Sequence, residues 1–150
     1  MRWAQRGIVY HGKVGDLERA LADVQKAVEV TRNADRRIEY KILALALGLR
    51  LGRAVTSETV VAAIPSRDAK LWHSRLVEVL VGSAPYEALA EDTVEPTLRA
   101  YLLLAEAVRT ELAGDRLGAL ARYREASEVP RPIALPRVMA TIAAAALAEQ

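Results

Sequence analysis

The chain has 150 residues, of which 52% are hydrophobic and 27% are charged, and its formal net charge is +2. These proportions fit one globular domain with a hydrophobic core and exclude an intrinsically disordered chain. The absence of cysteine excludes disulfides, thiol catalysis and thiolate metal sites. Because acidic and basic residues alternate without a long single-sign block, the charge pattern argues against direct nucleic-acid binding.

The sequence carries no sign of membrane insertion or secretion. The apolar stretch Thr141–Ala148 is far shorter than the roughly 18 residues that a membrane-spanning helix needs. The first residues lack the charged, apolar and small-residue pattern of a secretory signal. We therefore expect a cytoplasmic protein that does not bind membranes.

Apolar residues recur at helical spacing along the whole chain, and runs of strict β-type alternation are missing. This pattern predicts an all-α fold. Glycines, prolines and capping residues set the limits of each helix. In chain order, the predicted helices are Met1–Gly12, Leu17–Thr31, Arg36–Arg50, a short helix from a Thr56 or Ser57 cap to Ile64, Asp68–Val81, Tyr86–Ala90, Val94–Ala113, Asp115–Val129 and a last helix from Pro136 to the end.

Glycines mark the predicted turns between helices. We expect Asp16 to cap the second helix, and Asp92 or Thr93 to cap the helix that follows them. The turn glycines are Gly15, Gly52, Gly82 and Gly114. These turns divide a single predicted domain, 1–150, into four helical hairpins and a terminal helix. The hairpins cover residues 1–33, 34–66, 67–92 and 93–130, and the terminal helix covers 133–150.

Two distant segments repeat the same pattern. The Gly-Asp pairs at 15–16 and 114–115 lie 99 residues apart, which is three times 33, and small or apolar residues follow both at the same offsets. In the first copy these are Ala20, Val24 and Ala27, and in the second Ala119, Tyr123 and Ala126. A period near 33 residues is typical of helical-hairpin repeat arrays, which bind other proteins and seldom catalyse reactions.

The first copy, together with Trp3, Gly7 and Tyr10 before it, resembles a tetratricopeptide repeat, and the second copy resembles it with Leu103 and Ala107 before it. The resemblance implies a right-handed superhelix of antiparallel helical hairpins, a tetratricopeptide-like α-solenoid. It also implies close helix contacts of Gly7 with Ala20 and of Ala107 with Ala119. Several features depart from the family pattern, and among them Arg32 and Arg131 stand where a proline is common. Arg6 takes an apolar position, and the segment from Tyr10 to Gly15 has one extra residue.

Arrays of such degenerate repeats, rich in Ala, Leu and Arg, resemble the helical-repeat segments of large bacterial ATP-dependent transcriptional regulators. Two functions therefore stay open. The first is a non-catalytic protein–protein interaction scaffold that binds a protein partner or a second copy of the chain. The alternative is an effector-sensing or signal-transducing segment of a bacterial transcriptional regulator.

Candidate chemistry is sparse, and we expect no enzyme, cofactor or metal site. The segment from Gly7 to Lys13 matches G-x4-G-K of a phosphate-binding loop, but Val14 stands where a magnesium-binding hydroxyl is needed. We interpret it as a helix and its turn. His11 and His73 lie far apart, and neither belongs to a metal-binding spacing.

The densest basic cluster is Arg36 and Arg37, with Arg32, Arg50 and Arg53 near them in sequence. Such a cluster can contact phosphate or an acidic peptide, or it can be the solvated start of a helix. Because no aromatic residues interleave the arginines, the sequence favours the solvated helix.

An excess of apolar residues on the helices Arg36–Arg50 and Val94–Ala113 and on the last helix indicates either an interaction surface or a tightly curled array that buries these faces itself. The candidate interaction surface comprises Ile42, Leu45, Leu49, His73, Leu80, Leu104, Val108, Val138 and Ile142. For the last helix, we expect its uncharged face to pack on a second chain, in a two-fold dimer, or on sequence outside this chain.

Overall fold

A computed structural model describes residues 3–11, 15–54, 71–130 and 135–150. Within these ranges every regular element is helical and none is a strand, which confirms the all-α expectation. The chain separates into two compact units, Met1–Ser74 and Arg75–Gln150, and each is described by itself below. Their arrangement as one repeat domain stays a prediction.

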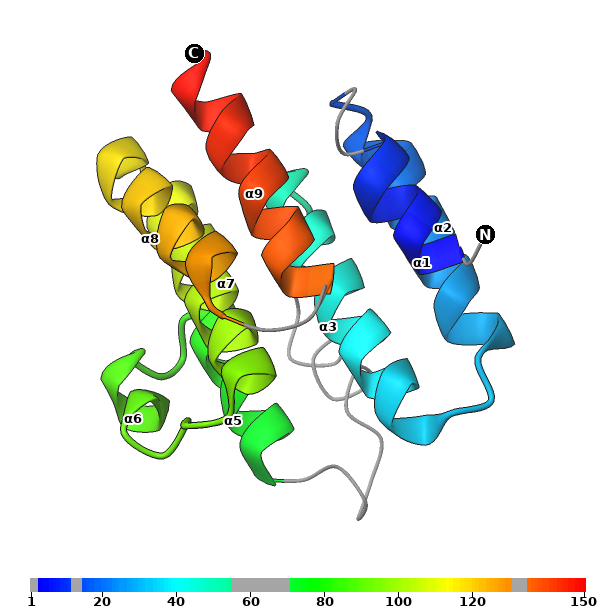
Figure 1. Ribbon diagram of the computed structural model, residues 1–150, viewed down its shortest axis with the longest axis horizontal. Helices are drawn as coiled ribbons and strands as arrows, with labels where there is room; N and C mark the ends of the chain where they lie inside the picture. The colour runs from blue at the N-terminus through cyan, green and yellow to red at the C-terminus, as the bar shows by residue number, and fades with distance from the viewer. Residues whose placement is uncertain (1–2, 12–14, 55–70, 131–134) are drawn as a thin grey trace. The chain divides into compact units, whose positions relative to one another are not determined.

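The first unit contains a short helix α1 (Trp3–Gln5), a π-helix η1 (Arg6–His11) and the longer helices α2 (Leu17–Val30) and α3 (Ala34–Arg50). Helix α1 and η1 pack on α2, and α2 packs on α3. Helices α2 and α3 run in opposite directions (Figure 1). The predicted short helix that ends at Ile64 lies outside the described residues.

The first helix differs from the single α-helix that the sequence predicts. After one turn of α-helix it continues as the π-helix η1, in which each hydrogen bond spans one residue more. The segment from Tyr10 to Gly15, which has one residue more than the repeat pattern, overlaps the end of η1. A π-helix absorbs an extra residue without ending the helix, and π-segments inside α-helices often mark functional sites.

Glycine allows this first helix to lie close to α2. A Cβ atom built on Gly7 would lie 2.8 Å from the carbonyl oxygen of Ala20 and 2.9 Å from Cβ of Asp23. Ala20 itself is almost completely buried. The predicted close contact between Gly7 and Ala20 is thus confirmed, and a side chain larger than hydrogen does not fit there.

The described residues of the second unit form α6 (Glu87–Ala90), α7 (Pro96–Leu112), α8 (Arg116–Glu128) and α9 (Leu135–Ala148), together with most of α5 (Leu71–Val81), which starts within the limits of the first unit. Helix α8 packs on both α7 and α9, and α9 also contacts α7. The chain reverses direction from α7 to α8 and again from α8 to α9 (Figure 1).

The described interior of the second unit is mainly apolar and contains two buried tyrosines, Tyr101 and Tyr123. Tyr123 is completely buried, and its hydroxyl group donates a hydrogen bond to Glu111 at the end of α7. Ala107 and Ala119 are also completely buried. Their predicted direct contact is consistent with this burial and with the packing of α7 on α8, and it stays a prediction.

The predicted turn glycines are confirmed. All four have the positive φ angles that favour glycine: Gly15 at 74°, Gly52 at 75°, Gly82 at 82° and Gly114 at 85°. At the end of α7, the amide of Gly114 donates to the carbonyl of Glu111 and the next amide, of Asp115, donates to the carbonyl of Thr110, at 3.0 and 3.2 Å. This pair of bonds is a Schellman motif, which satisfies carbonyls that the helix leaves open.

The two sequence copies also begin their second helices alike. Asp16 accepts a hydrogen bond from the amide of Arg19, and Asp115 accepts one from the amide of Gly118. Each carboxylate is the N-cap of its helix, as predicted for Asp16. The residues at the three shared offsets are buried in both copies: Ala20, Val24 and Ala27, and Ala119, Tyr123 and Ala126.

The predicted cap of α7 is wrong. Neither Asp92 nor Thr93 caps it, because the helix begins at Pro96 and the carboxylate of Glu95 accepts the amides of Thr97 and Leu98. Proline fits the first turn, because the backbone N–H groups there have no acceptor within the helix and the one that proline lacks is not needed. The Thr93 hydroxyl instead donates to the carbonyl of Leu89, at 2.7 Å.

Candidate functional site

The nine residues of the predicted interaction surface lie mostly in the interior. Val138 and Ile142 on α9 are half-buried. The other seven are buried: Ile42, Leu45, Leu49, His73, Leu80, Leu104 and Val108. Most of the apolar excess therefore belongs to the packed interior, where a partner cannot reach it without rearrangement. Binding through the half-buried face of α9 stays a prediction.

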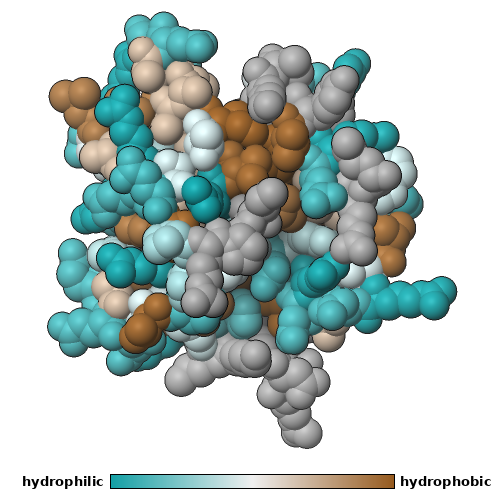
Figure 2. Space-filling view, in the orientation of Figure 1, coloured by the Kyte–Doolittle hydropathy of each residue, from teal (hydrophilic) through white to brown (hydrophobic). Residues whose placement is uncertain are grey.

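Polar residues cover most of the described surface on the face seen in Figure 2, and apolar residues gather in smaller areas between them. In the described ranges, large apolar side chains are exposed at five positions. Two of them, Trp3 and Val30, are 39% and 52% exposed and line the same groove. The other three are Val94, Leu112 and Leu117.

The groove lies within the first unit and has a volume of about 240 Å³. Three helices contribute to it: α1, the C-terminal end of α2 and the N-terminal part of α3. Its residues are Trp3, Ala4, Ala27, Val30, Thr31, Arg36 and Tyr40. Ala4 and Ala27 are buried and small, whereas Trp3, Val30 and Arg36 are exposed. The result is an open, mainly apolar groove with two aromatic side chains and one arginine.

An ion pair holds Trp3 in place at the groove. The guanidinium of Arg6 donates to both carboxylate oxygens of Asp23, at 2.7 and 2.6 Å, and the Asp23 side chain is only 9% exposed. The same guanidinium stacks over the indole of Trp3, 4.2 Å from the ring centroid. The hydrogen bond to Asp23 raises the pKa of Arg6, while burial lowers it.

This ion pair explains why a charged residue stands where the repeat pattern has an apolar one. Asp23 lies between Ala20 and Ala27 on the buried face of α2, and a buried carboxylate needs a partner. Arg6 supplies that partner from η1. The signal for this pair in the sequence is an aspartate inside an otherwise apolar stripe.

The basic cluster divides in the structure. Arg53 pairs with Glu18 at 2.6 Å, and Arg37 donates to the carbonyl of Thr31 at 2.5 Å. Arg36 lines the groove. The structure thus brings Arg36 beside Trp3 and Tyr40, although the sequence pattern showed no aromatic residues among the arginines. Among the described residues, no acidic side chain forms an ion pair with Arg36.

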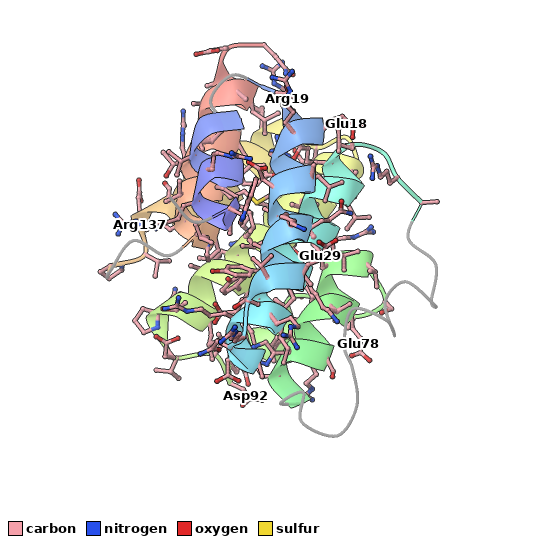
Figure 3. The ribbon with its side chains drawn as sticks, turned by 90° about the vertical axis from the view of Figure 1, so that its right-hand side faces the viewer. Glu18, Arg19, Glu29, Glu78, Asp92 and Arg137 are labelled. Atoms are coloured by element: carbon pink, nitrogen blue, oxygen red, sulfur yellow. The ribbon has the colours of Figure 1, made fainter. Side chains whose placement is uncertain are left out.

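The groove lies at one end of α2. Glu18 and Arg19 lie near the start of this helix and Glu29 near its end (Figure 3), and Ala27, Val30 and Thr31 of the groove belong to the same end as Glu29. Glu29 is paired with Lys26, at 2.9 Å. Lys26 thus partly neutralises the negative charge of Glu29 at this end of α2.

A second polar cluster, in the second unit, centres on Glu106 of α7. Burial raises the pKa of Glu106, and the nearby charges of Arg122 and Arg109 lower it, while Glu87 raises it further. Arg122 also lies over the ring of Tyr86, 5.1 Å from the centroid, and pairs with Glu125. These contacts tie α6, α7 and α8 together, which is a structural role.

Other predicted chemistry can be placed only in part. Gly7 to His11 of the G-x4-G-K segment are helical, and Gly12 and Lys13 lie outside the described residues. Over residues 3–11, 15–54, 71–130 and 135–150, no three metal-ligating side chains gather in one place. In the same ranges, no helix combines the length and apolar character needed to cross a membrane.

Comparison of this chain with protein-family models, with curated proteins and with solved structures finds no match. The resemblance to tetratricopeptide repeats therefore depends on the residue pattern alone.

Proposed function

We propose that this protein is a non-catalytic protein–protein interaction scaffold, a right-handed superhelix of about four tetratricopeptide-like hairpins and a terminal helix. The groove of α1, α2 and α3 is the observation that carries the proposal. It is lined by Trp3 and Val30, two of the five large apolar side chains that are exposed among the described residues. Exposed aromatic and aliphatic side chains in a groove commonly mark a binding site for another protein.

The local structure of the two sequence copies supports the repeat architecture. Both have a glycine with positive φ, an aspartate N-cap and three buried residues at equal offsets. Equal sequence spacing with equal caps and burial is what a duplicated hairpin would retain.

The size of the groove favours a scaffold over the alternative, an effector-sensing segment of a bacterial regulator. Small-molecule pockets have volumes of roughly 300–1,000 Å³ and enclose most of their ligand. The groove has about 240 Å³ and two exposed walls, Trp3 and Val30. It suits a side chain presented by another protein better than a whole effector molecule.

The proposed function is tested by selecting random 12-residue peptides displayed on phage against the full chain. We expect selected peptides to bind with micromolar affinity, and the double substitution Trp3→Ser and Val30→Ser to weaken binding at least tenfold. The control is Val94→Ser with Leu117→Ser, which removes two even more exposed apolar side chains outside the groove. Failure to select any peptide, or equal binding to the groove variant, would overturn the proposal.

A further inference from the structure

The shape of the groove restricts what can occupy it. Its buried residues, Ala4 and Ala27, are small, and the side chains of Trp3, Val30 and Tyr40 stand around them. A volume of about 240 Å³ with this lining accepts one bulky aliphatic or aromatic side chain. The rest of the occupant must then lie along the edge of the groove, where Arg36 is exposed.

The charge along that edge is positive. The segment Thr31–Arg37 contains three arginines and one aspartate, which gives a net charge of +2. The nearby carboxylates of Asp23 and Glu29 are paired with Arg6 and Lys26. The Arg36 guanidinium, with its several donors in a planar fork, is suited to a carboxylate.

From these two observations we infer that the groove binds an acidic segment of a protein partner, one that inserts a single bulky apolar side chain between Trp3 and Tyr40 and places a carboxylate on Arg36. Arg6 acts as a positioning residue, because its ion pair with Asp23 fixes the guanidinium on which the Trp3 indole stacks. This inference rests on the proposed scaffold function and specifies the chemistry of the partner.

Three synthetic 12-residue peptides test the inference. Each has one central leucine, and the flanking residues are alternating glycine with aspartate, with serine or with lysine. Binding to the full chain is followed by the indole N–H signals in ¹⁵N–¹H spectra, and the signal of Trp3 is the one that disappears in Trp3→Phe. We expect the aspartate peptide to shift this signal and to bind roughly three to ten times more tightly than the serine peptide, with the lysine peptide weakest. The preference should shrink as salt increases.

Two arginine substitutions serve as a matched pair. Arg36→Gln is expected to reduce the preference for aspartate over serine to less than about twofold, and Arg36→Lys should retain most of it. Arg19→Gln makes the same charge change on an exposed residue of α2, about 16 Å along the helix from Val30, and should retain the full preference. Circular dichroism spectra of all three variants should match that of the parent, because both arginines are exposed.

Several outcomes would overturn the inference. These are a lysine peptide that binds as tightly as the aspartate peptide, a preference that survives Arg36→Gln, or the absence of any Trp3 shift with all three peptides at millimolar concentration. If phage selection yields groove-dependent peptides and these peptides are neutral or basic, the acidic partner is wrong while the scaffold function stands. If selection yields no peptide, the scaffold function itself fails.

Discussion

Glycine-to-alanine substitutions at two positions of the first unit should have opposite effects on stability. At Gly7 the new Cβ would lie 2.8 Å from a backbone oxygen of α2, closer than carbon and oxygen can approach, so η1 and α2 must move apart. Overpacking of this kind costs about 1–3 kcal/mol, and the gain in helix propensity offsets roughly 0.5–1 kcal/mol of it. We expect Gly7→Ala to lower the free energy of unfolding by about 1–2 kcal/mol.

Gly48, inside α3, is the matched control. Apart from the nearby backbone of α3 itself, no described heavy atom would lie within 4 Å of a Cβ added there, so the substitution gains helix propensity without a clash. Gly48→Ala should raise the free energy of unfolding by about 0.5 kcal/mol. The two variants should thus differ by about 2 kcal/mol in urea unfolding followed by circular dichroism at 222 nm. If Gly7→Ala is as stable as Gly48→Ala, the close approach of η1 to α2 is wrong, and so is the geometry of the groove beside it.

Three further predictions concern the second unit, the phosphate-loop motif and association. Ala119→Leu should overpack the interface of α8 with α7 and lower the free energy of unfolding by about 1–3 kcal/mol. An unchanged thermal unfolding curve would contradict the predicted repeat register. Calorimetric titration with ATP and magnesium should give no binding through Lys13, and micromolar affinity would refute our interpretation of that motif. Light scattering at micromolar concentration should detect a dimer that Ile142→Glu dissociates, whereas a monomeric parent would remove α9 as a self-association surface.

Local signals in the sequence predicted the helices and their ends well. All four turn glycines, Gly15, Gly52, Gly82 and Gly114, have positive φ. A residue with no Cβ adopts this conformation at little cost, so glycine is a reliable signal for it. The aspartate that follows Gly15 caps α2 as predicted. The cap of α7 was missed because four acidic or hydroxyl residues stand at positions 91–95, and only the position of Pro96 decides among them.

The groove could not be predicted, because its residues come from three helices. Trp3, Val30 and Tyr40 each fit an ordinary helical apolar pattern, and nothing in that pattern shows that all three side chains surround one space. The excess of apolar residues, in contrast, predicted a surface where the structure has an interior. Leu80, Leu104 and Val108 suggested a surface, yet they are buried, since composition alone does not reveal on how many sides a helix is covered.

The π-helix and the ion pair of Arg6 with Asp23 were visible only as departures from the repeat pattern. One extra residue can lengthen a loop or widen a helical turn, and the sequence did not distinguish the two. The structure places one of these departures, Arg6, next to Trp3, with its guanidinium over the indole ring and paired with Asp23. The departure at Arg6 therefore lies beside Trp3, which lines the groove.

Photo-crosslinking along α2 tests the central claim, that this protein binds others through the groove, most directly. Benzoylphenylalanine is introduced at Val30, inside the groove, or at Glu18, exposed near the other end of the same helix (Figure 3), and each protein is irradiated with a biotin-labelled peptide from the phage selection. Efficient crosslinking is expected at position 30 and little at position 18. Equal crosslinking at both positions, or crosslinking at position 18 alone, would contradict it.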